Sequence, residues 1–146
     1  AVAARGAAGA RLRAARVVDD FFVAGPLQEA ALDLVSSPAW RTHRRRRAEA
    51  LRERRDALVA AIRREMPAAS LDRVPAGGFH VWLRLPEGVD DVELAAEAAR
   101  NGVIVSPGRP WFPGEPEGPY LRLAFAGAPA AELERGVQIL GTLLQP

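Results

Sequence analysis

The sequence predicts an α/β protein of α+β-like type, in which a small open sheet is flanked by helices and preceded by one long helix. Two patterns support this fold class. Residues 37 to 66 carry apolar side chains at helical spacing, and after residue 67 short alternating segments are separated by turns and by two amphipathic stretches. Apolar residues make up 49% of the 146-residue chain, which is enough to bury a core.

The first elements are helical. Residues 9 to 20 and 25 to 35 are predicted to form short helices, the second opened by a Gly-Pro turn. Ser37 is a suitable N-cap for the long helix, Pro38 fits its first position, and the pair Met66-Pro67 ends it. At about 1.5 Å per residue this helix is about 40 Å long. A helix of that length can join two bodies.

The sheet is predicted from the segments that follow. Residues 70 to 74 and 77 to 85 are expected to be strands joined by the turn "PAGG", and residues 103 to 106 and 120 to 126 two further strands. Residues 90 to 102 predict a helix, with Asp90 and Glu93 at capping-box spacing. The last helix begins near Pro129.

Composition excludes several kinds of chemistry. The chain has no cysteine, so disulfides and thiolate metal sites are excluded, and a cytoplasmic location is the default expectation. No apolar run approaches the roughly 20 residues of a membrane span. All 20 basic residues are arginine. Without lysine, this chain cannot form a Schiff base through a side-chain amine.

The long helix is strongly basic. Trp40 to Met66 holds ten arginines against four acids, a local charge of +6 in a chain of net charge +2. Such a helix can follow nucleic-acid phosphates. No aromatic residues interleave with the arginines, so we interpret it as a solvated face. His43 and His80 are isolated, which argues against a metal site and favours packing or surface roles.

Arg122 is the sharpest candidate for a binding residue. In the strand "GPYLRLAFA" the alternation puts Leu121, Leu123 and Phe125 on one face, with Arg122 on the other. A guanidinium group there suits bidentate capture of a carboxylate, and the alternative is a charge that faces water. The preceding loop, with Trp111 and Phe112, is either a pocket lid or a stiff surface loop.

Five segments in order resemble a known family: "GPLQEAAL", "WRTHRRRRAEALRERRDAL", "VPAGGFHVWLRLPEGVD", "GVIVSPGRPWFPGE" and "YLRLAFA". Together they resemble the C-terminal third of class I/II aminotransferases, which are pyridoxal phosphate (PLP) enzymes of fold type I. The resemblance covers essentially the whole chain. It implies that residues 1 to 36 end the large cofactor domain, 37 to 66 form the linking helix and 67 to 146 form the small domain.

The resemblance also implies roles for individual residues. Arg122 has the place of the arginine that binds the substrate α-carboxylate. Further positions are implied near the pocket mouth, namely Arg109, Trp111 and Phe112. Others are implied near the cofactor and the subunit boundary, namely Gly25, Pro26 and Gln28. No residue of this chain is predicted to be catalytic or to bind a metal.

The cofactor and partners follow from the same resemblance. PLP is expected in a full-length parent, with its lysine upstream of Ala1, and not covalently attached to this chain. The parent is expected to be a homodimer that takes amino acid and keto acid substrates and does not associate with a membrane. Phe21, Phe22 and Val23 are expected to face a missing domain or a second subunit, which favours self-association.

A rival from another class is the MocR-type regulators of the GntR group. In these an N-terminal winged-helix domain binds DNA and an aminotransferase-like domain senses an effector. His80, after the aromatic residue in "GGFHVWLRL", resembles the pattern common in those regulators. A third alternative is an autonomous interaction module. The sequence leaves enzyme and regulator open.

Overall fold

The computed structural model describes residues 4–19 and 23–145. Contacts divide the chain into two compact units, residues 1–44 and 45–146. The division falls inside a helix, and the three-part organisation expected from the sequence stays a prediction. Phe21 and Phe22, expected to face another domain, lie outside the described residues.

The first unit is helical. Helix α1 spans Gly6–Asp19 and helix α2 spans Gly25–Ser36, as the sequence predicts to within a few residues. Gly9 is the one buried residue of α1, and α2 has none. Val23 and the apolar side chains of α2 are exposed, among them Leu27, Leu32 and Leu34.

Helix α3 spans Pro38–Glu65, so the predicted long helix is confirmed. Ser37 separates it from α2. The Ser37 Oγ accepts a hydrogen bond from the Trp40 N–H at 3.3 Å, as an N-cap does, and donates to the Leu34 carbonyl at 2.8 Å. One hydroxyl thus closes the end of α2 and opens α3. The buried residues of α3 lie toward its C-terminal end: Leu58, Val59, Ala61 and Ile62.

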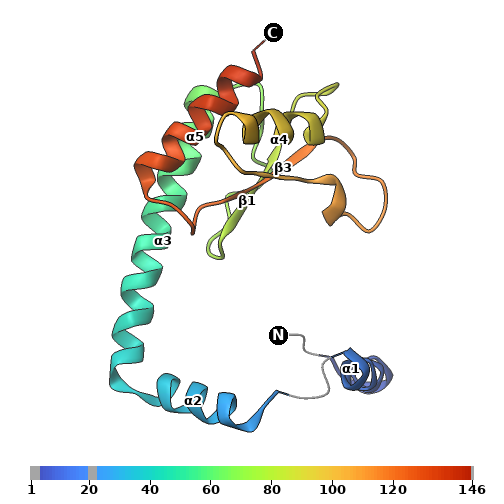
Figure 1. The fold of residues 1–146 in the computed structure, drawn as a ribbon, viewed down its shortest axis with the longest axis vertical. Helices are drawn as coiled ribbons and strands as arrows, with labels where there is room; N and C mark the ends of the chain where they lie inside the picture. The colour runs from blue at the N-terminus through green and yellow to red at the C-terminus, as the bar shows by residue number, and fades with distance from the viewer. Residues whose placement is uncertain (1–3, 20–22, 146) are drawn as a thin grey trace. The chain divides into compact units, whose positions relative to one another are not determined.

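The second unit contains a three-stranded antiparallel sheet with strand order β1-β3-β2 (Figure 1). Strand β1 is His80–Arg84, β2 is Ser106–Pro107 and β3 is Tyr120–Ala124. The predicted burial alternation in β3 is confirmed, because Leu121, Leu123 and Phe125 are all buried. An open sheet with helices, all strands antiparallel, is the α+β-like fold that the sequence predicts.

Helices cover one face of this sheet. Helix α4 spans Asp91–Arg100 and α5 spans Ala130–Leu143, and Figure 1 shows α5 beside the C-terminal part of α3. The core joins α3, α4 and α5 to the strand residues Val81, Leu83, Leu121 and Leu123. The opposite face of the sheet carries the alternate strand residues, and it is this face that holds Arg122.

Two predicted strands differ from the structure. The strand predicted at residues 103 to 106 overlaps the short β2 only at Ser106. Residues 70 to 74 form no strand; Ser70 makes a single antiparallel bridge with Arg84. The turn before β1 does need a glycine, because Gly78 has a φ of 91°. Strand β1 pairs along its whole length with β3, which lies far along the sequence, and among the described residues it pairs with the segment before the turn only through the Ser70–Arg84 bridge.

None of the helices in the described part of the chain is long and apolar enough to cross a membrane.

Candidate functional site

The site is built on the sheet face away from the helices. Arg122 is paired with Trp82 of β1 on one side and with Ser106 of β2 on the other. Directly opposed residues of antiparallel strands project to the same face. His80, opposite Ala124, therefore lies on this face too, one diagonal step from Arg122. Sequence alternation within one strand could not reveal these neighbours, because they come from the cross-strand register.

Arg122 is partly buried, and within the described residues its Nε has no hydrogen-bond acceptor. Its guanidinium carbon lies 3.7 Å from the centroid of the Trp111 ring. Among the described residues its Nε is buried without a hydrogen-bond partner, and no carboxylate forms an ion pair with the guanidinium. Buried polar atoms without partners are uncommon in folded proteins. A planar acceptor such as a carboxylate would supply the missing hydrogen bonds.

Aromatic rings wall this face beside Arg122. Phe112 packs against both Trp82 and Tyr120, with ring centroids 5.7 Å and 5.4 Å away. Trp82 and Tyr120 also meet edge to face at 6.2 Å. The cluster buries Tyr120, although alternation places it on the outward face. It leaves Trp111 53% exposed and Trp82 37% exposed, so both rings remain accessible to a ligand.

His80 is electrostatically coupled to Arg122. Partial burial lowers the pKa of His80 below its usual value, and the positive charge of Arg122 lowers it further. Near neutral pH the imidazole is therefore uncharged, and it can donate or accept a hydrogen bond at the site. The sequence pattern favoured a packing or surface role for His80. It could not show that His80 lies near Arg122, because that nearness depends on the β1–β3 register.

The loop residues predicted near a pocket mouth separate into two groups. Trp111 and Phe112 lie against the Arg122 face. Arg109 points instead to the start of α4: its backbone N–H and its guanidinium each donate to Asp91 at 3.0 Å. Asp91 is 2% exposed. Asp91 was not predicted as a site residue, because its only signal in the sequence is that of an acid in the first turn of a helix.

Gly25, Pro26 and Gln28 belong to the first unit. Helix α2 begins at Gly25, with Pro26 at its first turn, and Gln28 Nε2 donates to the Val23 carbonyl at 2.7 Å. This bond satisfies a carbonyl at the start of the helix. Their predicted place near a cofactor stays a prediction.

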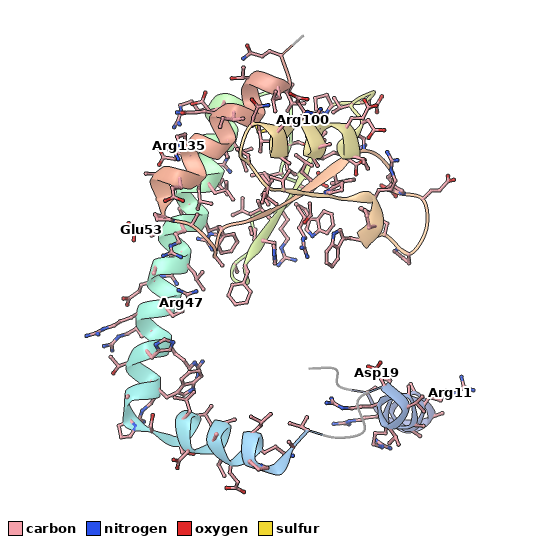
Figure 2. The ribbon with its side chains drawn as sticks, in the orientation of Figure 1. Arg11, Asp19, Arg47, Glu53, Arg100 and Arg135 are labelled. Carbon is pink, nitrogen blue, oxygen red and sulfur yellow. The ribbon has the colours of Figure 1, made fainter. Side chains whose placement is uncertain are left out.

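Two arginines of the basic helix α3 make hydrogen bonds within the fold. Figure 2 shows Arg47 and Glu53 projecting from α3. Arg54 donates to the Ala126 carbonyl at 3.0 Å and Arg55 to the Pro75 carbonyl at 3.0 Å, so these two arginines support the fold. In the described ranges no cluster of three His, Cys, Asp or Glu side chains could hold a metal ion.

The chain is similar to proteins of two kinds, aminotransferases and transcriptional regulators. The chain is 32% identical over 100 residues to aminotransferase tdiD of Emericella nidulans, covering 66% of this chain and 23% of that protein. It is 28% identical over 135 residues to the HTH-type transcriptional regulator YdcR of Escherichia coli, covering 92% of this chain and 29% of the relative. The chain thus spans about a quarter of the length of these relatives.

A solved structure matches most of the chain. The α-aminoadipate aminotransferase LysN of Thermus thermophilus, in complex with N-(5′-phosphopyridoxyl)-L-leucine, is 28% identical and covers 94% of this chain and 35% of its own, with a TM-score of 0.77. The model for "Aminotransferase class I and II" matches residues 6–140. The chain therefore belongs to the class I and II aminotransferase family.

Proposed function

We propose that residues 67–146 form the carboxylate-binding small domain of a PLP-dependent protein, in which Arg122 binds the α-carboxylate of an amino acid. The observation that carries this proposal is the buried Nε of Arg122, which lies on an aromatic sheet face and has no hydrogen-bond partner in the part of the chain that the structure describes. An arginine fork matches the two oxygens of a carboxylate, and the rings beside it reduce the competition from water. The phosphopyridoxyl-leucine bound by LysN shows that a relative takes a ligand of this class.

The chain's own residues do not fit covalent attachment of PLP. There is no lysine in the sequence, so no side-chain amine is present to bind the cofactor aldehyde. The cofactor, when bound by the family, supplies an electron sink for chemistry at the substrate Cα. The proposed part of this chain is to hold the carboxylate, fix the orientation of the ligand and exclude water as the domain closes over it.

The experiment compares Arg122→Ala and Arg122→Lys in a full-length protein that carries this sequence and is loaded with PLP. Loss of a charged bidentate hydrogen bond predicts that binding of an amino acid donor weakens by roughly 10- to 100-fold in Arg122→Ala. Arg122→Lys keeps the charge without the fork and should recover only part of the loss. Unchanged donor binding and half-reaction rate in Arg122→Ala would contradict the proposal.

The second candidate is an effector-sensing domain of a MocR-type regulator. The observation that supports it is the 28% identity to the regulator YdcR over 92% of the chain, an extent that the aminotransferase LysN equals at 28% identity over 94%. In that case Arg122 binds the carboxylate of an amino-acid-like effector, and DNA is bound by another domain. The coding sequence upstream of Ala1 discriminates the two, since a winged-helix domain there indicates the regulator. Both forms are proposed as homodimers.

A further inference from the structure

Trp111 is held over Arg122 by contacts on both sides. It ends the short 3-10 helix η1, Arg109–Trp111, and its N–H donates to the Gly108 carbonyl at 2.9 Å. On one side of η1 lies the Asp91–Arg109 pair, and on the other Phe112 packs against Tyr120. The Gly108 N–H donates to the Tyr120 carbonyl at 2.7 Å, which ties the turn to β3.

The Asp91–Arg109 pair holds the start of η1 in place, and we call this pair the anchor. Asp91 receives the backbone N–H of Arg109 on one carboxylate oxygen and its guanidinium on the other, both at 3.0 Å. Because Asp91 is 2% exposed, these bonds are shielded from water on the acid's side. A buried carboxylate that lost them would keep its desolvation cost without compensation. The pair therefore fixes where η1 begins, two residues before Trp111.

The Trp111 ring restricts Arg122 to one orientation. Stacking at 3.7 Å covers one face of the guanidinium and leaves its hydrogen-bonding edge for in-plane acceptors. A free arginine side chain loses considerable rotamer freedom when it binds a ligand. A guanidinium already held against a ring loses less, so part of the ordering is complete before the ligand arrives.

We infer that Trp111 is a positioning residue for Arg122, and that the ion pair between Arg109 and Asp91 sets Trp111 in place. This inference deepens the proposed function and rests on it. It gives Arg109 a role different from direct ligand contact: its charge acts through the turn that carries Trp111. The site would then bind a carboxylate through the guanidinium of Arg122, which Trp111 has already oriented. The loop 108–112 holds Trp111 in that position.

The test uses the full 146-residue chain and NMR of the arginine Nε–Hε groups, with sodium propionate as the carboxylate probe and propionamide as its uncharged control. The Arg122 signal is assigned by its loss in Arg122→Lys. The ring current of Trp111 should shift the Arg122 Hε signal upfield in the parent chain. Trp111→Leu should abolish that shift and weaken propionate binding roughly 3- to 10-fold, and Trp111→Phe should restore most of both.

The anchor is tested on exposed residues, which leaves the fold intact. Arg109→Gln removes the guanidinium and keeps the backbone N–H bond to Asp91; it should reduce the upfield shift and weaken propionate binding roughly 2- to 5-fold. Arg100→Gln is the matched control, because Arg100, which is labelled in Figure 2, is also exposed and pairs with an acid of α4, Glu97. It should leave both readouts unchanged.

The outcomes separate the inference from the proposed function. If the parent chain binds propionate through Arg122 and Trp111→Leu changes neither the Hε shift nor the affinity, the positioning role is wrong. An effect of Arg109→Gln no larger than that of Arg100→Gln would overturn the anchor. If the parent chain does not bind propionate, the proposed carboxylate site is wrong. The change in the Arg122 Hε shift in Trp111→Leu still shows whether Trp111 orders Arg122.

Discussion

Trp82 and Arg122 face each other across the β1–β3 ladder, and Trp111 stacks on the same arginine from the loop after β2. Two indole rings from distant parts of the sequence thus flank one cation. Neither ring satisfies the arginine's hydrogen-bonding capacity, because aromatic faces attract the charge but do not accept the in-plane Nε–H bond. The site therefore has apolar walls and a polar group that no described residue satisfies.

The first prediction contrasts Arg122 with its neighbour Leu123. Arg122→Met removes both the stacking on Trp111 and a buried Nε that has no hydrogen-bond partner among residues 4–19 and 23–145. The free energy of unfolding should therefore change by less than about 1 kcal/mol. Leu123→Ala, at a position 4% exposed, should cost about 2–5 kcal/mol. Urea unfolding measures both. A loss of several kcal/mol in Arg122→Met would show that the arginine is needed for folding.

The second prediction concerns the close approach of Gly108 to β3. A Cβ on Gly108 would lie 2.5 Å from the Tyr120 Cβ and 2.9 Å from its carbonyl oxygen. Since neither atom can move freely, Gly108→Ala should destabilise the chain by about 1–3 kcal/mol. Gly114→Ala is the control, since no atom of the described residues lies within 4 Å of its added Cβ, and a change within about 0.5 kcal/mol is expected. Equal effects in chemical denaturation would contradict this account.

The third prediction is a pH dependence at the N-cap of α4. Hydrogen bonds from the backbone N–H groups of Glu93 and Val92, at 3.0 Å and 2.8 Å, lower the pKa of Asp90, with a further contribution from Arg109. The stabilisation is complete above the usual aspartate pKa of about 3.9 and is lost as the pH falls through the lower folded-state pKa.

Asp90→Ala should therefore lower the Tm at neutral pH, and its difference from the parent chain should shrink below about pH 4. Asp90→Asn keeps a capping oxygen without a titrating charge, so it should lose less stability and show a flatter pH profile. Thermal unfolding followed by circular dichroism from about pH 2 to about pH 7 gives these curves. A Tm difference that stays constant down to the most acidic point would argue against the charged cap.

The fourth prediction uses His80 as a reporter of Arg122. Burial and the Arg122 charge lower the pKa of His80, so the unfolded chain binds the proton first as the pH falls. Stability is highest above the usual histidine pKa of about 6.5 and decreases as the pH falls toward the folded-state value. Arg122→Met should raise the pKa of His80, because only the burial effect remains.

Proton NMR of the imidazole ring follows this titration, with the His43 signals as an internal reference. A carboxylate bound at Arg122 should shift the pKa of His80 in the same direction as Arg122→Met, since it screens the same charge. No response of His80 to either change would mean that the two side chains are not coupled as their strand register indicates.

Local sequence signals predicted most elements well. The Ser37-Pro38 pair and the Met66-Pro67 pair bracket α3 within one residue at each end, because capping and the proline restriction act over a single turn. The strand predicted at residues 70 to 74 is reduced to the bridge at Ser70. A strand needs a partner along its edge, and residue pattern alone does not show which segments come to lie side by side.

The same limit applies to the site. Alternation within β3 placed Arg122 opposite the buried leucines, and the absence of lysine excluded a Schiff base on this chain; both are local properties that the sequence by itself determined. Only the tertiary structure decided that Trp111 covers Arg122, that His80 and Trp82 share its face, and that Arg109 pairs with Asp91. The physical reason is that these contacts depend on strand register and loop packing, which join residues far apart in the chain.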